Sequence, residues 1–183
     1  DGLSSKNLFD NDSILFEIIK SQLFNNDNLN VLLNIKVKNI INLNELNNLF
    51  LKIGVEEGEI RLSNSSIIWK DDVDIILNEC LVTYENNEIN LIGDIKFKFK
   101  DIDDFYSSYQ IKKNHRKKIK EIKLDFVYNF LQKSISFDNV KIDNNSNENI
   151  DEFINQFDLK GKRVFNKITF KNFLNNFFGI YAG

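Results

Sequence analysis

The sequence is poor in the residues that most often build metal centres, disulfides and nucleophilic active sites. Its 183 residues include one cysteine, Cys80, one histidine, His115, and no methionine. A single cysteine excludes an intramolecular disulfide, and a zinc site usually needs several His or Cys ligands. The sequence therefore predicts no metal and no cofactor. The absence of methionine, at position 1 as elsewhere, leads us to expect a segment of a longer protein or a processed product.

Long apolar runs and a strong net charge are also absent. No run of about 18 apolar residues occurs, so the sequence predicts no membrane-spanning helix. The net charge of -3 at pH 7 gives no long-range attraction to nucleic acid. The hydrophobic fraction of 42% is close to that of ordinary globular domains. We expect residues 1–183 to form a single folded domain.

The most informative stretch that is present is the segment 80–99. Apolar residues alternate there with polar or smaller ones, and a period of two places successive side chains on opposite faces of a sheet. The alternation breaks at Asn86 and Asn87, a residue type that tolerates a left-handed backbone, so the segment predicts a β-hairpin. A hairpin with one apolar face needs a cover for that face, either helices of the same chain or a bound apolar ligand.

The remaining patterns predict further strands separated by short helices and turns. Strands are expected at 29–37, 60–62, 67–69, 73–77, 119–130 and 134–142. Helices are expected at 13–24, 43–50, 101–109, 150–157 and 164–180. Turns or loops are expected at 63–66, 70–72 and 143–147.

Adjacent strands interrupted by short helices indicate the α+β class. We expect a curved antiparallel β-sheet, open like a groove, with short helices at its edges or ends and a C-terminal helix. Six residues with a shared period-two phase are expected on its apolar face and are the candidates for contact with an apolar ligand: Leu91, Ile95, Phe97, Leu124, Phe126 and Tyr128.

The strongest charge cluster is the basic segment 112–118. Its five cations are candidates for contact with phosphate head groups or with a partner: Lys112, Lys113, Arg116, Lys117 and Lys118. We favour a solvated loop and place head-group or partner contact second. We expect no binding of nucleic acid, because the run is short and has no interleaved aromatic residues. His115 lies in this exposed connector without visible partners for acid–base chemistry, so we expect no catalytic role for it.

The loop 143–147 begins like a calcium-binding loop but does not continue as one. Glu148 stands where the invariant glycine belongs and Ile154 where the bidentate glutamate belongs, so we interpret the loop as a turn. Trp69 and the 17 phenylalanines fit a lipid-lined groove or an ordinary core, and for each of them the core is favoured. Neither a phosphate-binding glycine loop nor a nucleophile elbow occurs, and we expect no catalytic residues.

The stretch 58–77, which runs from Gly58 through Trp69 to Leu77, resembles the recurring hairpin in the C-terminal region of AsmA-like bacterial envelope proteins. The segments 90–95, 101–109 and 124–142 are similar to that region as well, so the resemblance spans residues 55–183. It implies the C-terminal segment of a longer periplasmic protein, with an inner-membrane anchor upstream. It also implies a curved sheet whose apolar concave face guides phospholipids towards the outer membrane, without enzymatic activity.

Three functions follow for testing. The leading one is non-enzymatic: an apolar β-groove that supports phospholipid transport or outer-membrane assembly, with phospholipid and the membrane surface as partners. Exposing an acyl chain to water costs about 0.8 kcal/mol per methylene, so an uncovered face of Ile, Leu and Phe would shelter one. The alternative is a structural or assembly module whose own helices cover the sheet. The third is an enzyme whose site the sequence does not reveal.

Overall fold

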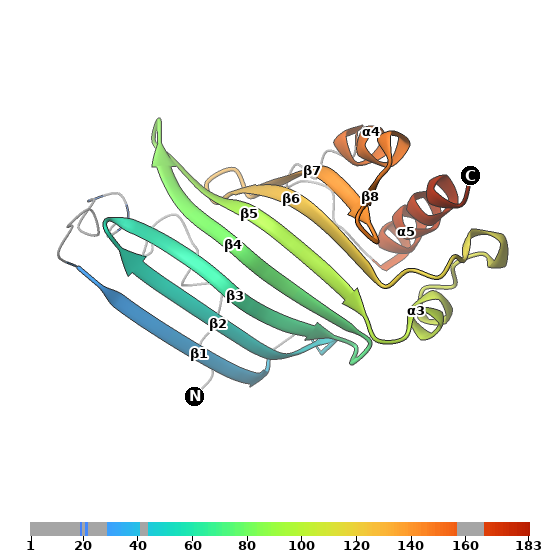
Figure 1. Cartoon of the computed structure of the whole chain (residues 1–183), viewed down its shortest axis with the longest axis horizontal. Coiled ribbons are helices and arrows are strands. Elements are labelled where there is room, and N and C mark those ends of the chain that lie inside the picture. The colour runs from blue at the N-terminus through green and yellow to red at the C-terminus, as the bar shows by residue number, and fades with distance from the viewer. Residues whose placement is uncertain (1–18, 20, 22–28, 41–43, 157–166) are drawn as a thin grey trace.

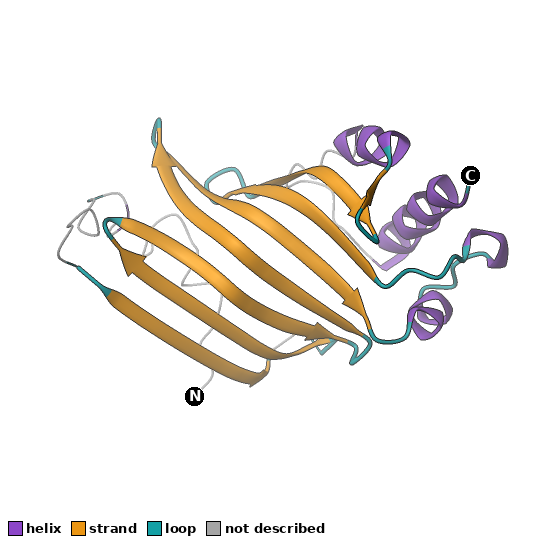
Figure 2. Cartoon of the chain, viewed as in Figure 1, coloured by secondary structure: helices purple, strands orange, loops and turns teal. Residues whose placement is uncertain are grey.

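The computed structural model describes residues 19, 21, 29–40, 44–156 and 167–183, which form an open eight-stranded antiparallel sheet with three α-helices (Figures 1 and 2). Each strand pairs with the next one in the sequence, so the sheet is a simple meander. The expected α+β class and antiparallel pairing are confirmed. The strands are β1 (Val31–Asn39), β2 (Leu46–Glu56), β3 (Glu59–Trp69), β4 (Val73–Glu85), β5 (Glu88–Phe99), β6 (Glu121–Asn129), β7 (Ser134–Ile142) and β8 (Asn145–Ser146).

The helices gather at one end of the sheet, on the side of the later strands (Figure 1). They are α3 (Ile102–Ser108), α4 (Glu148–Gln156), α5 (Lys167–Ala182) and the single 3-10 turn η1 (Lys113–His115). The expected C-terminal helix is confirmed from residue 167 onwards. Apart from residues 19 and 21, the helix expected at 13–24 lies outside the described residues.

The hairpin predicted at 80–99 is confirmed as β4 and β5. Asn86 and Asn87 form its turn with φ angles of 51° and 62°, the two positive values that a type I′ turn requires. Further along β5, a Cβ atom on Gly93 would lie 2.5 Å from Cys80 Sγ and 2.7 Å from Cys80 Cα. Glycine at this position therefore lets β5 approach β4 closely, beside the register shift between Leu77 and Leu81.

The helix predicted at 43–50 is wrong, because residues from Leu46 onwards form β2. Asn48 has a φ of 49°, and the pairing of β2 with β3 shifts register between Asn47 and Phe50. This irregularity breaks the period-two alternation and leaves Leu46 and Leu49 three residues apart, a spacing that imitates one face of a helix.

The turn predicted at 63–66 is also wrong, because these residues continue β3. Ser65 is fully buried, and its Oγ accepts a hydrogen bond of 2.9 Å from the backbone N–H of Lys52. The hydroxyl thus satisfies a β2 donor where the ladder is irregular. Neighbouring Asn64 has a φ of 52°, so the polar residues accommodate a distorted strand rather than a reversal of the chain.

Several local predictions are confirmed. The helix expected at 101–109 is α3, and the Asp101 side chain caps it by accepting hydrogen bonds from the backbone N–H groups of Asp103 and Asp104. The break at 70–72 is a turn in which Lys70 and Asp71 have positive φ. The loop 143–147 contains the predicted turn, and its residues 145 and 146 form the short strand β8, which pairs with β7.

Most apolar residues of the long strands share one face of the sheet, whereas Ile92 and Val127 lie on the other face. A row of direct cross-strand partners runs from β1 to β7: Val31, Val55, Ile60, Val82, Leu91, Tyr128 and Ile135. We call this side the apolar face. The six residues predicted on it do share it, because Leu91 pairs with Tyr128 and Ile95 with Leu124, in phase with Phe97 and Phe126.

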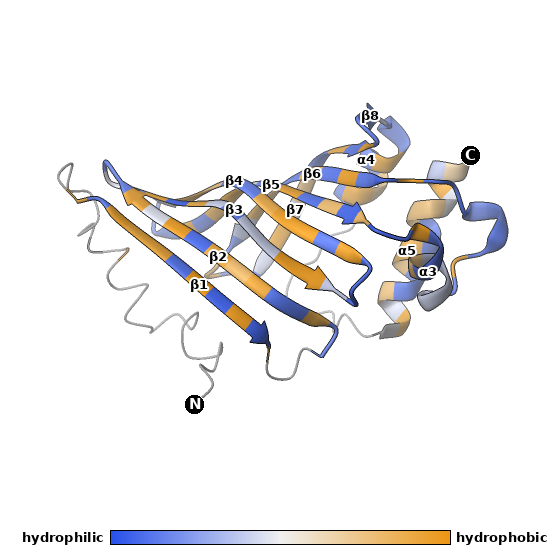
Figure 3. Ribbon diagram, turned by 60° about the horizontal axis from the view of Figure 1, so that its bottom comes forward, coloured by the Kyte–Doolittle hydropathy of each residue, from blue (hydrophilic) through white to orange (hydrophobic). Residues whose placement is uncertain are grey.

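The apolar face is covered unequally along the sheet (Figure 3). In the covered half, β4–β7, it packs against α3, α4 and α5 and forms the main hydrophobic core. In the exposed half, β1–β3, only Val55 and Ser65 are buried, and Val31 and Leu33 are 44% and 49% exposed. The core of the molecule therefore lies at the helical end of the sheet.

Candidate functional site

The most distinctive feature of the covered half is an apolar cavity of about 280 Å³ between the sheet and α5. Every side chain that lines it is apolar. The lining residues are Trp69, Phe97, Phe99, Phe105, Ile122, Leu124, Phe137, Ile154, Phe170, Phe173, Leu174, Phe177 and Phe178. Its volume is just below the ~300–1,000 Å³ of typical small-molecule sites, so it suits one narrow apolar group.

The residues that line the cavity differ in burial. We call the buried ones the wall: Phe105, Ile122, Leu124, Ile154, Leu174, Phe177 and Phe178. We call the half-buried ones the rim: Trp69, Phe97, Phe99, Phe137, Phe170 and Phe173. An apolar group in contact with the wall would be shielded from water.

A continuous set of aromatic contacts joins the sheet to the helices around the cavity. Trp69 lies 5.4 Å from Phe105 and 5.5 Å from Phe170, measured between ring centroids. Phe105 contacts Phe99 at 5.2 Å and Phe178 at 6.2 Å, both edge-to-face. Edge-to-face packing is a favoured geometry of aromatic pairs and fixes ring orientation. The cavity wall is therefore assembled from β3, β5, α3 and α5 together.

Polar groups anchor the Trp69 end of the cavity from outside. Trp69 Nε1 and the Tyr109 hydroxyl each donate a hydrogen bond of 3.4 Å to Glu45 Oε2, and Lys70 Nζ lies 3.2 Å from Glu45 Oε1. Burial, and next the Glu45 carboxylate, raise the pKa of Tyr109, so its hydroxyl remains a donor at neutral pH. These contacts orient Trp69 with its ring towards the cavity.

The six residues predicted to contact an apolar ligand fall into two groups. Phe97 and Leu124 line the cavity. Leu91, Ile95 and Tyr128 are half-buried and pack against the core outside the cavity, whereas Phe126 is buried in the core. The aromatic residues of α3 and α5 that complete the cavity were not predicted as site residues, although the 17 phenylalanines were the available signal.

The predicted basic segment forms the connection between α3 and β6, and it packs against α5. Lys112, Lys113, Lys117 and Lys118 are exposed, as a solvated loop predicts. The Arg116 side chain is instead half-buried, and its Nε donates a hydrogen bond of 2.9 Å to the backbone carbonyl of Ile111. Only four of the five predicted cations are therefore free to face a partner.

His115 is less exposed than predicted, because its ring packs against α5. A Cβ atom on Gly179 would lie 3.0 Å from His115 Cε1, and the buried Nδ1 atom has no hydrogen-bond partner among the described residues. The His115 ring of η1 therefore contacts α5 by van der Waals packing.

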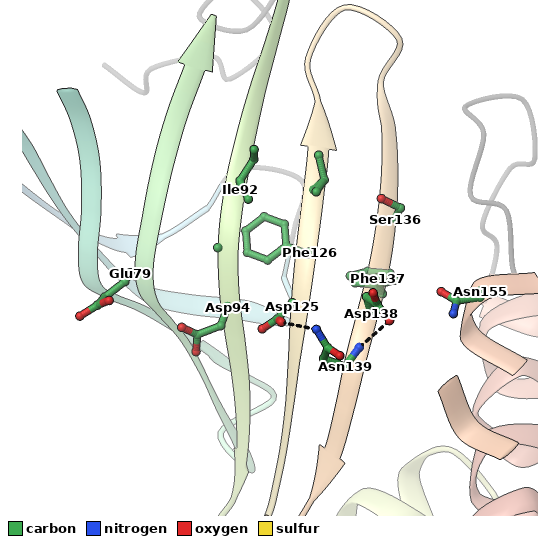
Figure 4. Close-up of a pocket in the computed structure, with 12 residues that line it drawn as sticks. Glu79, Ile92, Asp94, Asp125, Phe126, Ser136, Phe137, Asp138, Asn139 and Asn155 are labelled. Atoms are coloured by element: carbon green, nitrogen blue, oxygen red, sulfur yellow. Dashed lines mark hydrogen bonds between the residues drawn. The ribbon is translucent and has the colours of Figure 1, made fainter. Parts of the chain in front are cut away.

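A second hollow, of about 540 Å³, lies on the polar face of the sheet (Figure 4). Asp94, Asp125 and Asp138 point into this region from β5, β6 and β7. Asp94 pairs with Lys123 at 3.3 Å, and Asp125 accepts a hydrogen bond of 2.8 Å from Asn139. Asp94 is thus the lining carboxylate with an ion pair, and the neutral Asn139 donates to the carboxylates of Asp125 and Asp138.

We searched the described residues for clusters of metal ligands and for helices able to cross a bilayer. No group of three or more His, Cys, Asp or Glu residues there could hold a metal ion. Among the described helices, none combines the length and hydrophobicity needed to cross a bilayer. Burial raises the pKa of Cys80 from 9.0 to about 11, which keeps its thiol protonated and unreactive at neutral pH.

Comparison with known proteins gives no relative for this chain: no protein-family model, no curated protein and no solved structure matches it. The resemblance to AsmA-like proteins over residues 55–183 therefore stays a prediction.

Proposed function

We propose that this protein is a non-enzymatic lipid-binding protein that holds an acyl chain in the apolar cavity between the covered half of the sheet and α5. The observation that carries the proposal is the composition of the cavity wall, in which all the lining side chains are apolar. Such a wall offers a substrate no group for proton transfer, nucleophilic attack or metal coordination. It offers a place where methylene groups leave water.

The free energy for binding comes from the hydrophobic effect. Each methylene group transferred from water contributes about 0.8 kcal/mol. Rigid aromatic rings at the rim, such as Trp69 and Phe170, lose little conformational entropy when they pack against a ligand. The head group of the lipid would remain at the rim in contact with solvent.

The exposed half of the sheet extends the same apolar face beyond the cavity. Val31 and Leu33 of β1 lie in phase with the core residues, yet about half of each side chain is exposed. This continuity favours a groove along which an acyl chain could lie. Together with the resemblance to AsmA-like proteins, it leads us to propose phospholipid transport or outer-membrane assembly in the periplasm, with an inner-membrane anchor upstream of this segment.

A structural module without ligand is the second candidate, and one observation favours it. Helices α3, α4 and α5 already bury much of the apolar face, with Tyr106, Phe178 and Ile150 at 1% exposure or less. If the cavity only reflects imperfect packing of large rings, these helices would serve stability alone.

The test is to fill the cavity without disturbing the sheet. Leu174 lines the cavity, so Leu174→Trp should lower the affinity for dodecanol at least about tenfold while the protein stays folded. Leu91→Trp adds the same volume on the apolar face outside the cavity and should leave affinity unchanged. Binding is measured by calorimetry, and independently by the rise of Tm that a ligand of the native state causes. Failure of dodecanol to raise the Tm of the wild type would contradict the proposal.

Phe97→Asp separates the two candidate functions. Phe97 is half-buried at the cavity rim. If the rim is a ligand entrance, the new carboxylate stays hydrated, and acyl-chain binding is lost with a modest fall in Tm. If the helices seal the face permanently, the substitution buries an unpaired carboxylate at a cost of several kcal/mol and unfolds the domain. Thermal melting beside photo-crosslinking to lipid distinguishes these outcomes.

A further inference from the structure

A basic patch lies at the helical end of the molecule, outside the cavity. We define it by the exposed side chains of Lys112, Lys113, Lys117 and Lys118. Among the described residues, none of these four ammonium groups forms an ion pair. Elsewhere the described lysines include several that do, such as Lys96 with Glu121. Four unpaired cations within seven residues stand out in a chain of net charge -3.

The acidic residues of α3 precede this patch in the sequence. Asp101, Asp103 and Asp104 occupy the beginning of α3, whereas the patch follows its end. Burial, and next the carboxylate of Asp104, raise the pKa of Asp72 in the turn before β4, which places that turn in the acidic region. The connection after α3 therefore concentrates positive charge, whereas these carboxylates lie at the beginning of α3 and in the turn before β4.

Stabilisation of α5 explains only part of the patch. Cations near the C-terminal end of a helix interact favourably with its dipole, but the effect falls off within the last turn. Lys117 meets this need, since its Nζ lies 5.9 Å from the centroid of the Tyr181 ring near the end of α5. Lys112, Lys113 and Lys118 remain without such a role.

The patch is firmly joined to the helix that forms the cavity wall. The backbone N–H of Lys112 donates a hydrogen bond of 3.1 Å to Asn175 Oδ1, and His115 packs against Gly179. Asn175 and Gly179 belong to the same helix as Leu174 and Phe178, which line the cavity. A surface that engages the patch thus lies beside the helix that encloses the proposed acyl chain.

We propose that the basic patch docks the protein on the surface of a bilayer that contains anionic phospholipid. The inference rests on the proposed function, because the bilayer would be the source of the acyl chain that the cavity holds. Charge complementarity carries it: each lysine near an anionic membrane contributes about 1 kcal/mol, and four exposed lysines without an ion pair lie within seven residues of this one connection. The membrane is bound by the patch, and α5 is held next to it.

The experiment is co-sedimentation with two kinds of vesicle, one of phosphatidylcholine alone and one in which about 30% of the lipid is phosphatidylglycerol. At this fraction several anionic lipids lie under the patch. The wild type should bind the anionic vesicles only, and raising the salt concentration should weaken binding because it screens the charges. Replacing all four patch lysines by glutamine should lower vesicle affinity at least about a hundredfold, at roughly fivefold per lysine.

A control variant makes the same change of charge elsewhere. It replaces four exposed lysines outside the patch, Lys36, Lys38, Lys98 and Lys141, by glutamine, so that both variants go from -3 to -7. The control should retain most of the wild-type affinity. Equal losses in the two variants, equal binding to vesicles of phosphatidylcholine alone, or binding to a DNA duplex in preference to vesicles would each overturn the inference.

The two proposals fail separately. The patch variant should bind dodecanol as the wild type does, because none of its four substitutions touches the cavity lining. Leu174→Trp should bind anionic vesicles as the wild type does. Loss of dodecanol binding in the patch variant with its fold retained would contradict the separation of patch and cavity on which the inference depends.

Discussion

The covered and exposed halves of the sheet have the same alternation of residues and very different burial. Leu124 in β6 is 7% exposed, whereas Leu33 in β1 is 49% exposed, although both lie on the apolar face. The difference arises from α3, α4 and α5, which bring Phe105, Ile154 and Phe178 against β4–β7. Period two therefore decides which face a strand residue occupies, and the helices decide whether that face is core or surface.

The largest expected difference comes from placing a charge at matched positions of the two halves. Leu124→Asp introduces a carboxylate among apolar side chains and should unfold the domain, at a cost of about 4 kcal/mol or more. Leu33→Asp leaves the carboxylate in water and should cost less than about 1 kcal/mol. Circular dichroism during urea titration measures both. Equal destabilisation would mean that β1–β3 is as well covered as β4–β7.

Truncation of apolar side chains should give the next largest difference. Phe178 is 1% exposed and contacts Tyr106 and Phe177, so Phe178→Ala should destabilise the protein by about 3–5 kcal/mol. Val31→Ala, at 44% exposure, should change the free energy of unfolding by less than about 1 kcal/mol. Urea midpoints compared at constant m-value give these changes. A small effect of Phe178→Ala would show that α5 contributes little to the core.

Two glycines permit a smaller and more specific comparison. Gly93→Ala, in the covered half, places a methyl group within 2.7 Å of backbone atoms of β4 and should cost about 1–3 kcal/mol. Gly54→Ala, in β2, meets nothing within 4 Å and should be neutral or stabilising by about 0.4–1 kcal/mol. Thermal melts should therefore show a lower Tm for Gly93→Ala and an unchanged or higher Tm for Gly54→Ala, and a stabilising Gly93→Ala would refute the close approach of β5 to β4.

The smallest expected effect on the free energy of unfolding is confined to alkaline pH. Burial raises the pKa of Cys80 from 9.0 to about 11 and that of Tyr106 from 10.0 to about 12. Between the unfolded and the native pKa of each group, the native state retains a proton that the unfolded state loses. The contribution of these two groups to stability is therefore complete below pH 9 and falls as the pH rises towards 12. The urea midpoint should decline from pH 9 more steeply in the wild type than in Cys80→Ala. Identical slopes would contradict burial of the thiol.

Local patterns predicted much of the fold correctly. The β4–β5 hairpin, helix α3, and strands β6 and β7 were all predicted from residues adjacent in the sequence. The errors at 43–50 and 63–66 fall where β2 and β3 pair irregularly, near Asn48 and Ser65. A bulge shifts the phase of side chains within a strand, so a local reading of spacing mistakes it for another structure.

Which residues share the apolar face follows from the amino-acid order alone, because side-chain alternation is a property of each strand. The β4–β5 turn follows from it as well, since Asn86 and Asn87 adopt positive φ readily. Contacts between segments distant in the sequence instead place α5 over one half of that face and leave Val31 and Leu33 exposed in the other. The cavity depends on rings from Trp69 to Phe178, and their distances are set by packing between distant segments that no local periodicity encodes.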